Sequence, residues 1–207
     1  MFLRRLPVLV LVLGMAIALA PFVGQAMVNS DELDELANAW RQLHGQVIYR
    51  DYFEFVPPLP QWLAAGLFAL GGPGVVWPRV LQALALVLAG LAQYGTARLA
   101  GVRPWLAVLP GLVLATALFP QFPVYYHHWL ALAFISGAVW CAARGLQAGK
   151  LPYSAIAGAL LGLAGLCTQT DGVLVAVAMG LTLVGQPRGR DHLVAAVAGC
   201  LVPLGLA

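Results

Sequence analysis

The chain has 207 residues, of which 61% are hydrophobic and only 9% are charged, and its formal net charge is +3. An ordinary soluble domain carries about 25% charged residues, so this composition, with a mean hydropathy of +0.87, excludes a disordered chain, a nucleic-acid-binding module and a typical cytosolic enzyme. Three cysteines are too few for a disulfide scaffold. The composition predicts an all-α, polytopic membrane helix bundle.

The first apolar run covers residues 6–23 and follows Arg4 and Arg5. Its length suits one bilayer crossing, which takes about 20 residues. A cleaved signal peptide is the alternative, because residues 24–26 offer small side chains directly after an apolar core.

Residues 24–74 form a connection far longer than a usual loop, and connections of this size are commonly functional. Asn29 and Ser30 are both good helix N-caps, and Glu32 stands three residues after Asn29, as a capping box requires. An apolar stripe at helical spacing follows, and Gly45 ends it. That stripe consists of Leu33, Leu36, Ala37, Trp40 and Leu43. The pattern predicts an amphipathic helix lying on the outer membrane face.

Six of the eight acids lie in the segment from Asp31 to Glu54. The simple interpretation is that acids at a helix start lie on a solvated face, where the helix dipole stabilises them. We favour that interpretation for Asp34 and Glu35. Asp31 and Glu32 follow the first span so closely that they could reach a substrate held at the lipid headgroups.

The second half of this loop is aromatic and rich in proline. Its aromatic residues suit the belt at a membrane interface; they are Tyr49, Tyr52, Phe53, Phe55 and Trp62. The prolines at 57, 58 and 60 turn the chain rigidly back toward the membrane. Residues 61–70 are too few to cross, so they predict an interfacial or re-entrant helix.

Six further apolar runs predict spans at 75–97, 105–119, 129–143, 156–167, 173–184 and 193–207. With the N-terminus inside, the positive-inside rule places eight of the eleven basic residues on the cytoplasmic side. The other side receives the 24–74 loop, the Tyr-Tyr-His-His stretch at 125–128 and the polar residues 168–171. We therefore expect about seven spans, and, because the last run stops inside a span, a fragment of a longer protein.

The polar landmarks of the outer loop resemble the N-terminal part of GT-C type integral-membrane glycosyltransferases of family 39, the protein O-mannosyltransferase and aminoarabinose transferase-like enzymes. These landmarks are Asp31-Glu32, Gly45, the Tyr-Arg-Asp-Tyr-Phe stretch at 49–53 and the Pro-Pro-Leu at 57–59. Residues 77–81, 97–101 and 158–171 extend the resemblance over nearly the whole chain. It implies that 1–207 is an N-terminal transmembrane module, with 24–74 as its outer catalytic loop.

The resemblance implies transfer of a sugar from a polyprenyl-phosphate carrier to a lipid, glycan or protein acceptor, with inversion, at the outer face of the cytoplasmic (inner) membrane. Asp31 would take the place of the catalytic base, with Glu32 beside it. A carboxylate can accept the proton of the attacking hydroxyl. The carrier phosphate requires positive charge or hydrogen-bond donors nearby.

Arg79 is the first candidate for the phosphate, because an arginine near hydrocarbon usually has a partner or a function. Its alternative is to snorkel to the outer headgroups. Arg50 is the second candidate, and its alternative is a salt bridge to Asp51 or Glu54. Tyr49, in the stretch that carries the resemblance, is counted among the substrate-binding candidates.

His127 and His128 complete the substrate-binding candidates. Neighbouring residues point to different sides of a helix, so the two are not expected to share a metal. One of them could join Asp31 or Glu32 around a divalent cation, or donate to a phosphate; metal use stays unassigned, and no nucleotide cofactor is expected. Asp171 either lines the carrier site or caps the next helix, and we favour the cap.

Two other kinds of protein remain open. One is a non-enzymatic multi-pass membrane protein, such as a transporter or an assembly subunit, and the other is an inactive truncated relative of the enzymes. Transporters usually carry polar groups or broken helices near the membrane midplane. Here the spans are nearly free of charge and the polar groups collect at one face, which favours chemistry at the outer interface.

Overall fold

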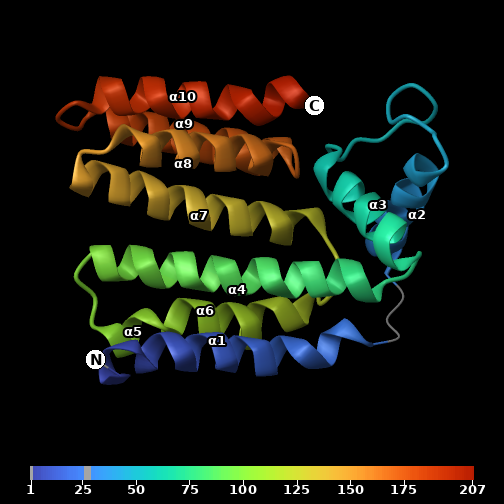
Figure 1. Ribbon diagram of the computed structural model, residues 1–207, viewed down its shortest axis with the longest axis horizontal. Helices are drawn as coiled ribbons and strands as arrows, with labels where there is room; N and C mark the ends of the chain where they lie inside the picture. The colour runs from blue at the N-terminus through green and yellow to red at the C-terminus, as the bar shows by residue number, and fades with distance from the viewer. Residues whose placement is uncertain (1, 26–28) are drawn as a thin grey trace.

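The structure is a computed structural model that describes residues 2–25 and 29–207, and it is an all-helical bundle (Figure 1). Long helices lie side by side along the molecule. They are α1 (Phe2–Val23), α4 (Val76–Leu99), α7 (His127–Ala148), α8 (Leu151–Gly165), α9 (Gln169–Val184) and α10 (Gly189–Leu206). Two shorter helices, α2 (Ser30–Leu43) and α3 (Leu59–Gly71), stand together at one end of the bundle (Figure 1).

A seventh lengthwise segment, Pro104–Gln121, is helical but irregular. It consists of α5 (Pro104–Ala107), α6 (Leu109–Val113), the π-helical η1 (Leu114–Leu118) and the 3₁₀-helical η2 (Phe119–Gln121). Among the described residues, five segments are long and apolar enough to cross a membrane: Arg5–Val23, Val76–Leu99, Pro104–Gln121, His127–Ala148 and Gly189–Leu206. The α8 and α9 helices, with 15 and 16 residues, are apolar but shorter. All seven expected spans therefore form helices, two of them short.

The first helix is packed into the bundle. Leu11, Met15 and Leu19 are at most 1% exposed and belong to one core cluster with Leu86 of α4. Burial of such side chains contributes about 1.5–3 kcal/mol each. This packing suits a retained span better than a signal peptide that is removed.

The α8 and α10 helices approach each other through small residues. A Cβ atom on Gly158 would lie 1.8 Å from the carbonyl oxygen of Ala196, and one on Gly199 would lie 1.9 Å from that of Ala155. Only glycine allows two helix backbones this close, which is the usual basis of helix packing in lipid.

The bundle brings the three predicted outer segments to one end. The turn after α8 contacts the start of α3, where the Leu59 amide donates to the Leu166 carbonyl at 3.0 Å. The Tyr125 hydroxyl donates to the Pro60 carbonyl at 2.6 Å. The polar residues after α8, the 125–128 stretch and the long loop therefore meet, and this end carries the candidate site.

The α2 helix forms where the sequence predicts it, and its polar face packs against the protein together with Leu36 of the apolar stripe. Its buried residues include Glu32, Glu35 and Asn38, whereas Leu33 and Trp40 of the predicted apolar stripe are 48% and 43% exposed. The reason is that each buried polar side chain finds a partner on another segment, so burial leaves its charge or amide compensated.

Candidate active site

The first turn of α2 sets the position of the candidate base. The Asn29 side-chain oxygen accepts hydrogen bonds from the Asp31 amide at 2.8 Å and from the Glu32 amide at 3.3 Å, which confirms the predicted N-cap. This cap fixes the helix start and leaves the Asp31 carboxylate exposed. The Glu32 carboxylate, which a capping box would turn back toward Asn29, has partners elsewhere.

Glu32 and Arg79 form a buried, bidentate ion pair between α2 and α4. Arg79 Nε lies 2.8 Å from Glu32 Oε1, and Nη2 lies 2.5 Å from Oε2. The two side chains are 1% and 3% exposed. Arg79 also donates to the Gln25 carbonyl at 2.5 Å, and Glu32 Oε1 accepts from the Tyr125 amide at 2.8 Å. Arg79 therefore points into the protein and does not snorkel to the headgroups.

Glu35 and His127 form a second pair beside the first. Glu35 Oε1 lies 2.5 Å from His127 Nδ1 and accepts from the His127 amide at 3.2 Å. Burial of Glu35, which is 2% exposed, raises the pKa of its carboxyl, and the contacts with His127 oppose that rise. The expectation that Glu35 lies on a solvated face is therefore wrong.

A polar cluster that the sequence did not single out holds the 47–56 segment on α2. The Asn38 amide donates to Glu54 at 2.5 Å and to Asp34 at 3.4 Å. Glu54 also accepts from the amides of Phe55 and Val56 at 2.8 and 3.0 Å. Partial burial, followed by the nearby Glu54 charge, raises the pKa of Asp34.

These contacts surround a polar cavity of about 510 Å³. Its polar lining is made up of Ser30, Asp31, Asp34, Glu35, Tyr126, His127 and His128. The structure therefore brings three predicted candidates, Asp31 and the two histidines, to one cavity, although they are almost a hundred residues apart in the chain. Glu32 and Arg79 do not line it.

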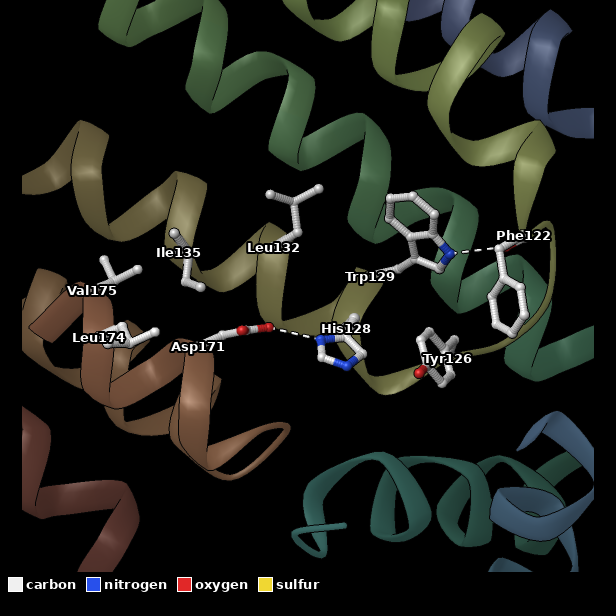
Figure 2. Close-up of a pocket in the computed structure, with 9 residues that line it drawn as sticks. All are labelled: Phe122, Tyr126, His128, Trp129, Leu132, Ile135, Asp171, Leu174 and Val175. Atoms are coloured by element: carbon white, nitrogen blue, oxygen red, sulfur yellow. Dashed lines mark hydrogen bonds and ion pairs between the residues drawn. The ribbon is translucent and has the colours of Figure 1, made fainter.

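His128 is paired with a third acid and borders a second cavity. Its Nδ1 lies 2.7 Å from Asp171 Oδ2, as Figure 2 shows. The expectation that Asp171 caps α9 is wrong, because Thr168 occupies the N-cap position and Asp171 lies inside the first turn. Both residues of this pair line an apolar cavity of about 530 Å³.

Besides Glu32 and Arg79, two further predicted candidates lie outside both cavities. Arg50 pairs with Asp51 through contacts of 2.7 and 3.0 Å, as the salt-bridge alternative expected, and the pair lowers the pKa of Asp51 to about 2. Tyr49 is 57% exposed and has a positive φ of 66°. Within residues 2–25 and 29–207, no three His, Cys, Asp or Glu side chains gather as a metal site would require.

Sequence reasoning overlooked Asn38, Glu54 and Gln82, whose side-chain oxygen accepts from the Tyr126 amide at 3.3 Å. A signal for the α2 residues was present. Glu32, Glu35 and Asn38 recur every three residues, so they form a polar stripe as regular as the apolar one. A helix with two competing stripes predicts a polar face turned toward a partner, which is what α2 shows.

Comparison with known proteins identifies the family and the fold. The family model for dolichyl-phosphate-mannose-protein mannosyltransferase matches residues 56–207. No curated protein matches the chain. The fold is similar to that in a structure of the S. cerevisiae protein O-mannosyltransferase Pmt1–Pmt2 complex bound to the sugar donor, with a TM-score of 0.76 and 20% identity. That match covers 98% of this chain and 32% of the yeast chain.

The family match extends over more than half of the chain, and the fold match extends over nearly all of it. Both agree with the resemblance found in the outer loop. The chain accordingly belongs to the dolichyl-phosphate-mannose-protein mannosyltransferase family, within the GT-C type membrane glycosyltransferases.

Proposed function

We propose that this chain carries the donor-side active site of a glycosyltransferase, which moves a sugar from a polyprenyl-phosphate carrier to an acceptor hydroxyl. The acceptor would be a lipid, a glycan or a protein. We place the reaction at the outer face of the cytoplasmic (inner) membrane, with the N-terminus inside and residues 24–74 as the catalytic loop. Family membership supports the class of reaction.

The proposal rests on one observation: the carboxylates at this end of the molecule differ in the hydrogen-bond and ion-pair partners that they have. Glu32 accepts from Arg79, and Glu35 and Asp171 each pair with a histidine. Asp31, among the described residues, accepts only from the hydroxyl of its neighbour Ser30, at 3.3 Å. Asp34, which also lines the cavity, accepts from the Asn38 amide at 3.4 Å. Asp31 is thus the cavity carboxylate least engaged by other side chains and the most available to a substrate.

The chemistry requires little more than this carboxylate and correct positioning. The acceptor oxygen forms a bond to the anomeric carbon while its proton passes to Asp31, and the bond from that carbon to the phosphate oxygen breaks. The carrier leaves as polyprenyl phosphate, a stable anion, so a strong general acid is not needed. Displacement from the opposite face of the sugar gives inversion.

Glu32 has a positioning role in this scheme. Its carboxylate is fully occupied and 1% exposed, so it is poorly placed to exchange a proton with a substrate. Because it follows Asp31 directly, its pair with Arg79 fixes the helix turn that presents Asp31 to the cavity. Pre-organised placement of a catalytic group is a major source of rate.

The test is carrier turnover by the full-length protein in liposomes, supplied with a panel of polyprenyl-phosphate sugars. Asp31→Asn keeps the shape of the side chain and removes its basicity, so we expect turnover to fall by about 10²–10⁴-fold while donor binding persists. Asp191→Asn, on the exposed start of α10, is the matched control and retains wild-type turnover. Full activity of Asp31→Asn would rule out its role as base, and absence of turnover or binding with every donor would contradict the transferase proposal.

A further inference from the structure

The polar and apolar cavities meet at shared residues. Tyr126 and His128 line both of them. The apolar cavity lies between α7 and α9 and is walled by Leu132, Ile135, Leu174 and Val175, with Trp129 at its side (Figure 2). A single molecule that fills both spaces must be polar at one end and apolar at the other, and its junction must lie next to His128.

His128 is built to hold an anion at that junction. Its Nδ1 faces the Asp171 carboxylate at 2.7 Å, so Nδ1 donates this hydrogen bond and Nε2 is the ring nitrogen left for a ligand. A phosphate is held there by the doubly protonated ring, which donates to Asp171 through Nδ1 and to the phosphate through Nε2. His127 is arranged in the same way against Glu35, and the two ring centroids are 4.5 Å apart. The rings also stand at the start of α7, a helix of 22 residues, whose N-terminal dipole favours negative charge.

The acids of the polar cavity restrict where an anion can lie. Asp31 and Asp34 line that cavity and would repel a phosphate placed between them. Glu35 also lines it, but this acid is already paired with His127. The histidine side of the cavity is therefore the favourable position. An anion there lies between the sugar space beside Asp31 and the apolar space along α7 and α9.

We propose that His128 binds the phosphate of a prenyl-phosphate donor. Asp171 is the positioning residue that orients the His128 ring. The apolar cavity between α7 and α9, here called the groove, receives the prenyl units next to the phosphate. This inference rests on the proposed function, because it names where the parts of the donor lie. In this assignment the phosphate is bound by a histidine–carboxylate pair and not by Arg79, which stays paired with Glu32.

Binding of farnesyl phosphate and of farnesol to the full-length protein in nanodiscs tests the phosphate half of the site. His128→Gln is expected to raise the Kd for farnesyl phosphate at least tenfold, as loss of a charge-assisted hydrogen bond does. Asp171→Asn is expected to raise it at least threefold. Neither variant should change the Kd for farnesol by more than about twofold. His44→Gln, at an exposed histidine outside both cavities, is the matched control and should bind as wild type does.

The groove half of the site is tested with the same two ligands. Leu174→Trp fills the apolar cavity and should weaken both ligands at least fivefold. Leu181→Trp, on the same helix and 72% exposed, should weaken neither. Inorganic phosphate at the same concentration should not displace farnesyl phosphate, because it gains nothing from the groove.

The outcomes separate this inference from the proposed function. Wild-type binding of farnesyl phosphate by His128→Gln overturns the phosphate assignment, and an equal loss with His44→Gln overturns it as well. Equal effects of the two tryptophan variants overturn the groove assignment. If the binding pattern is as expected but Asp31→Asn transfers sugar normally, the donor site stands and only the choice of base is wrong.

Discussion

Replacement of Glu32 by glutamine is the sharpest test of how this site is held together. The change keeps the size of the side chain and removes its charge. Arg79 then remains 3% exposed without the carboxylate that it contacts at 2.8 and 2.5 Å. Glutamine can replace one of these two contacts as an acceptor but cannot neutralise the guanidinium.

Loss of one partner from a buried ion pair typically costs about 3–5 kcal/mol, because the remaining charge is left uncompensated. The lower part of that range applies to Glu32→Gln, since Arg79 retains its bond to the Gln25 carbonyl and glutamine accepts one bond. We therefore expect unfolding free energy to fall by about 3 kcal/mol. Replacement of both residues, as in Glu32→Gln with Arg79→Met, should cost less than the sum of the single changes by at least about 2 kcal/mol.

The assay is unfolding in detergent, followed by circular dichroism, for the two single variants and the double variant. Arg50→Gln is the control, because it breaks an exposed pair in the same loop whose side chains are 67% and 32% exposed. Such exposed pairs contribute little to stability, because water screens the two charges. The reasoning is refuted if Glu32→Gln costs no more than Arg50→Gln, or if the effects of Glu32→Gln and Arg79→Met simply add.

Two further predictions concern stability elsewhere in the chain. The pKa of Asp34 is raised, so its protonated form is favoured by folding, and the stability this gives is lost as pH rises through the folded pKa. Asp34→Asn should therefore raise the unfolding temperature at pH 7.5 and lose that advantage toward pH 4; an equal gain at both pH values would contradict the argument. Gly158→Ala forces a Cβ to within 1.8 Å of the Ala196 carbonyl and should cost about 1–3 kcal/mol in the same unfolding assay. Gly165→Ala meets open space and should be nearly neutral, and the packing argument fails if the two substitutions cost the same.

The bundle could be predicted from sequence because lipid imposes a simple rule. Backbone groups in hydrocarbon must be paired internally, so a long apolar run can only be a helix. That rule predicted all seven lengthwise segments as helices. The distribution of basic residues predicted that the outer loops lie together at one end. The lipid rule could not identify the irregular course of Pro104–Gln121, where the chain passes through π and 3₁₀ turns, because proline positions alone do not determine the length of each turn.

The site was harder to predict because its contacts are distant in sequence. The N-cap at Asn29 is local, so the residues around it were sufficient to predict it. The face of α2 that is buried depends instead on Arg79 and His127, which lie 47 and 92 residues beyond Glu32 and Glu35. Hydrophobic periodicity places polar residues outside by default, and only the tertiary fold supplies the partners that reverse this for α2.

The pairing of charges explains how a chain with so few of them can leave one carboxylate, the proposed base Asp31, without a strong partner. Glu32 joins α2 to α4, Glu35 joins α2 to α7, and Asp171 joins α9 to α7. The pairs of Glu32 and Glu35 compensate acids that would be costly to bury alone, and the three pairs together link α2, α4, α7 and α9 at the end of the bundle that carries the candidate site. Asp31 is positioned by the same framework but is not used in it. For the proposed base, a position set by its neighbours and a carboxylate without a strong partner of its own are what proton acceptance from a substrate requires.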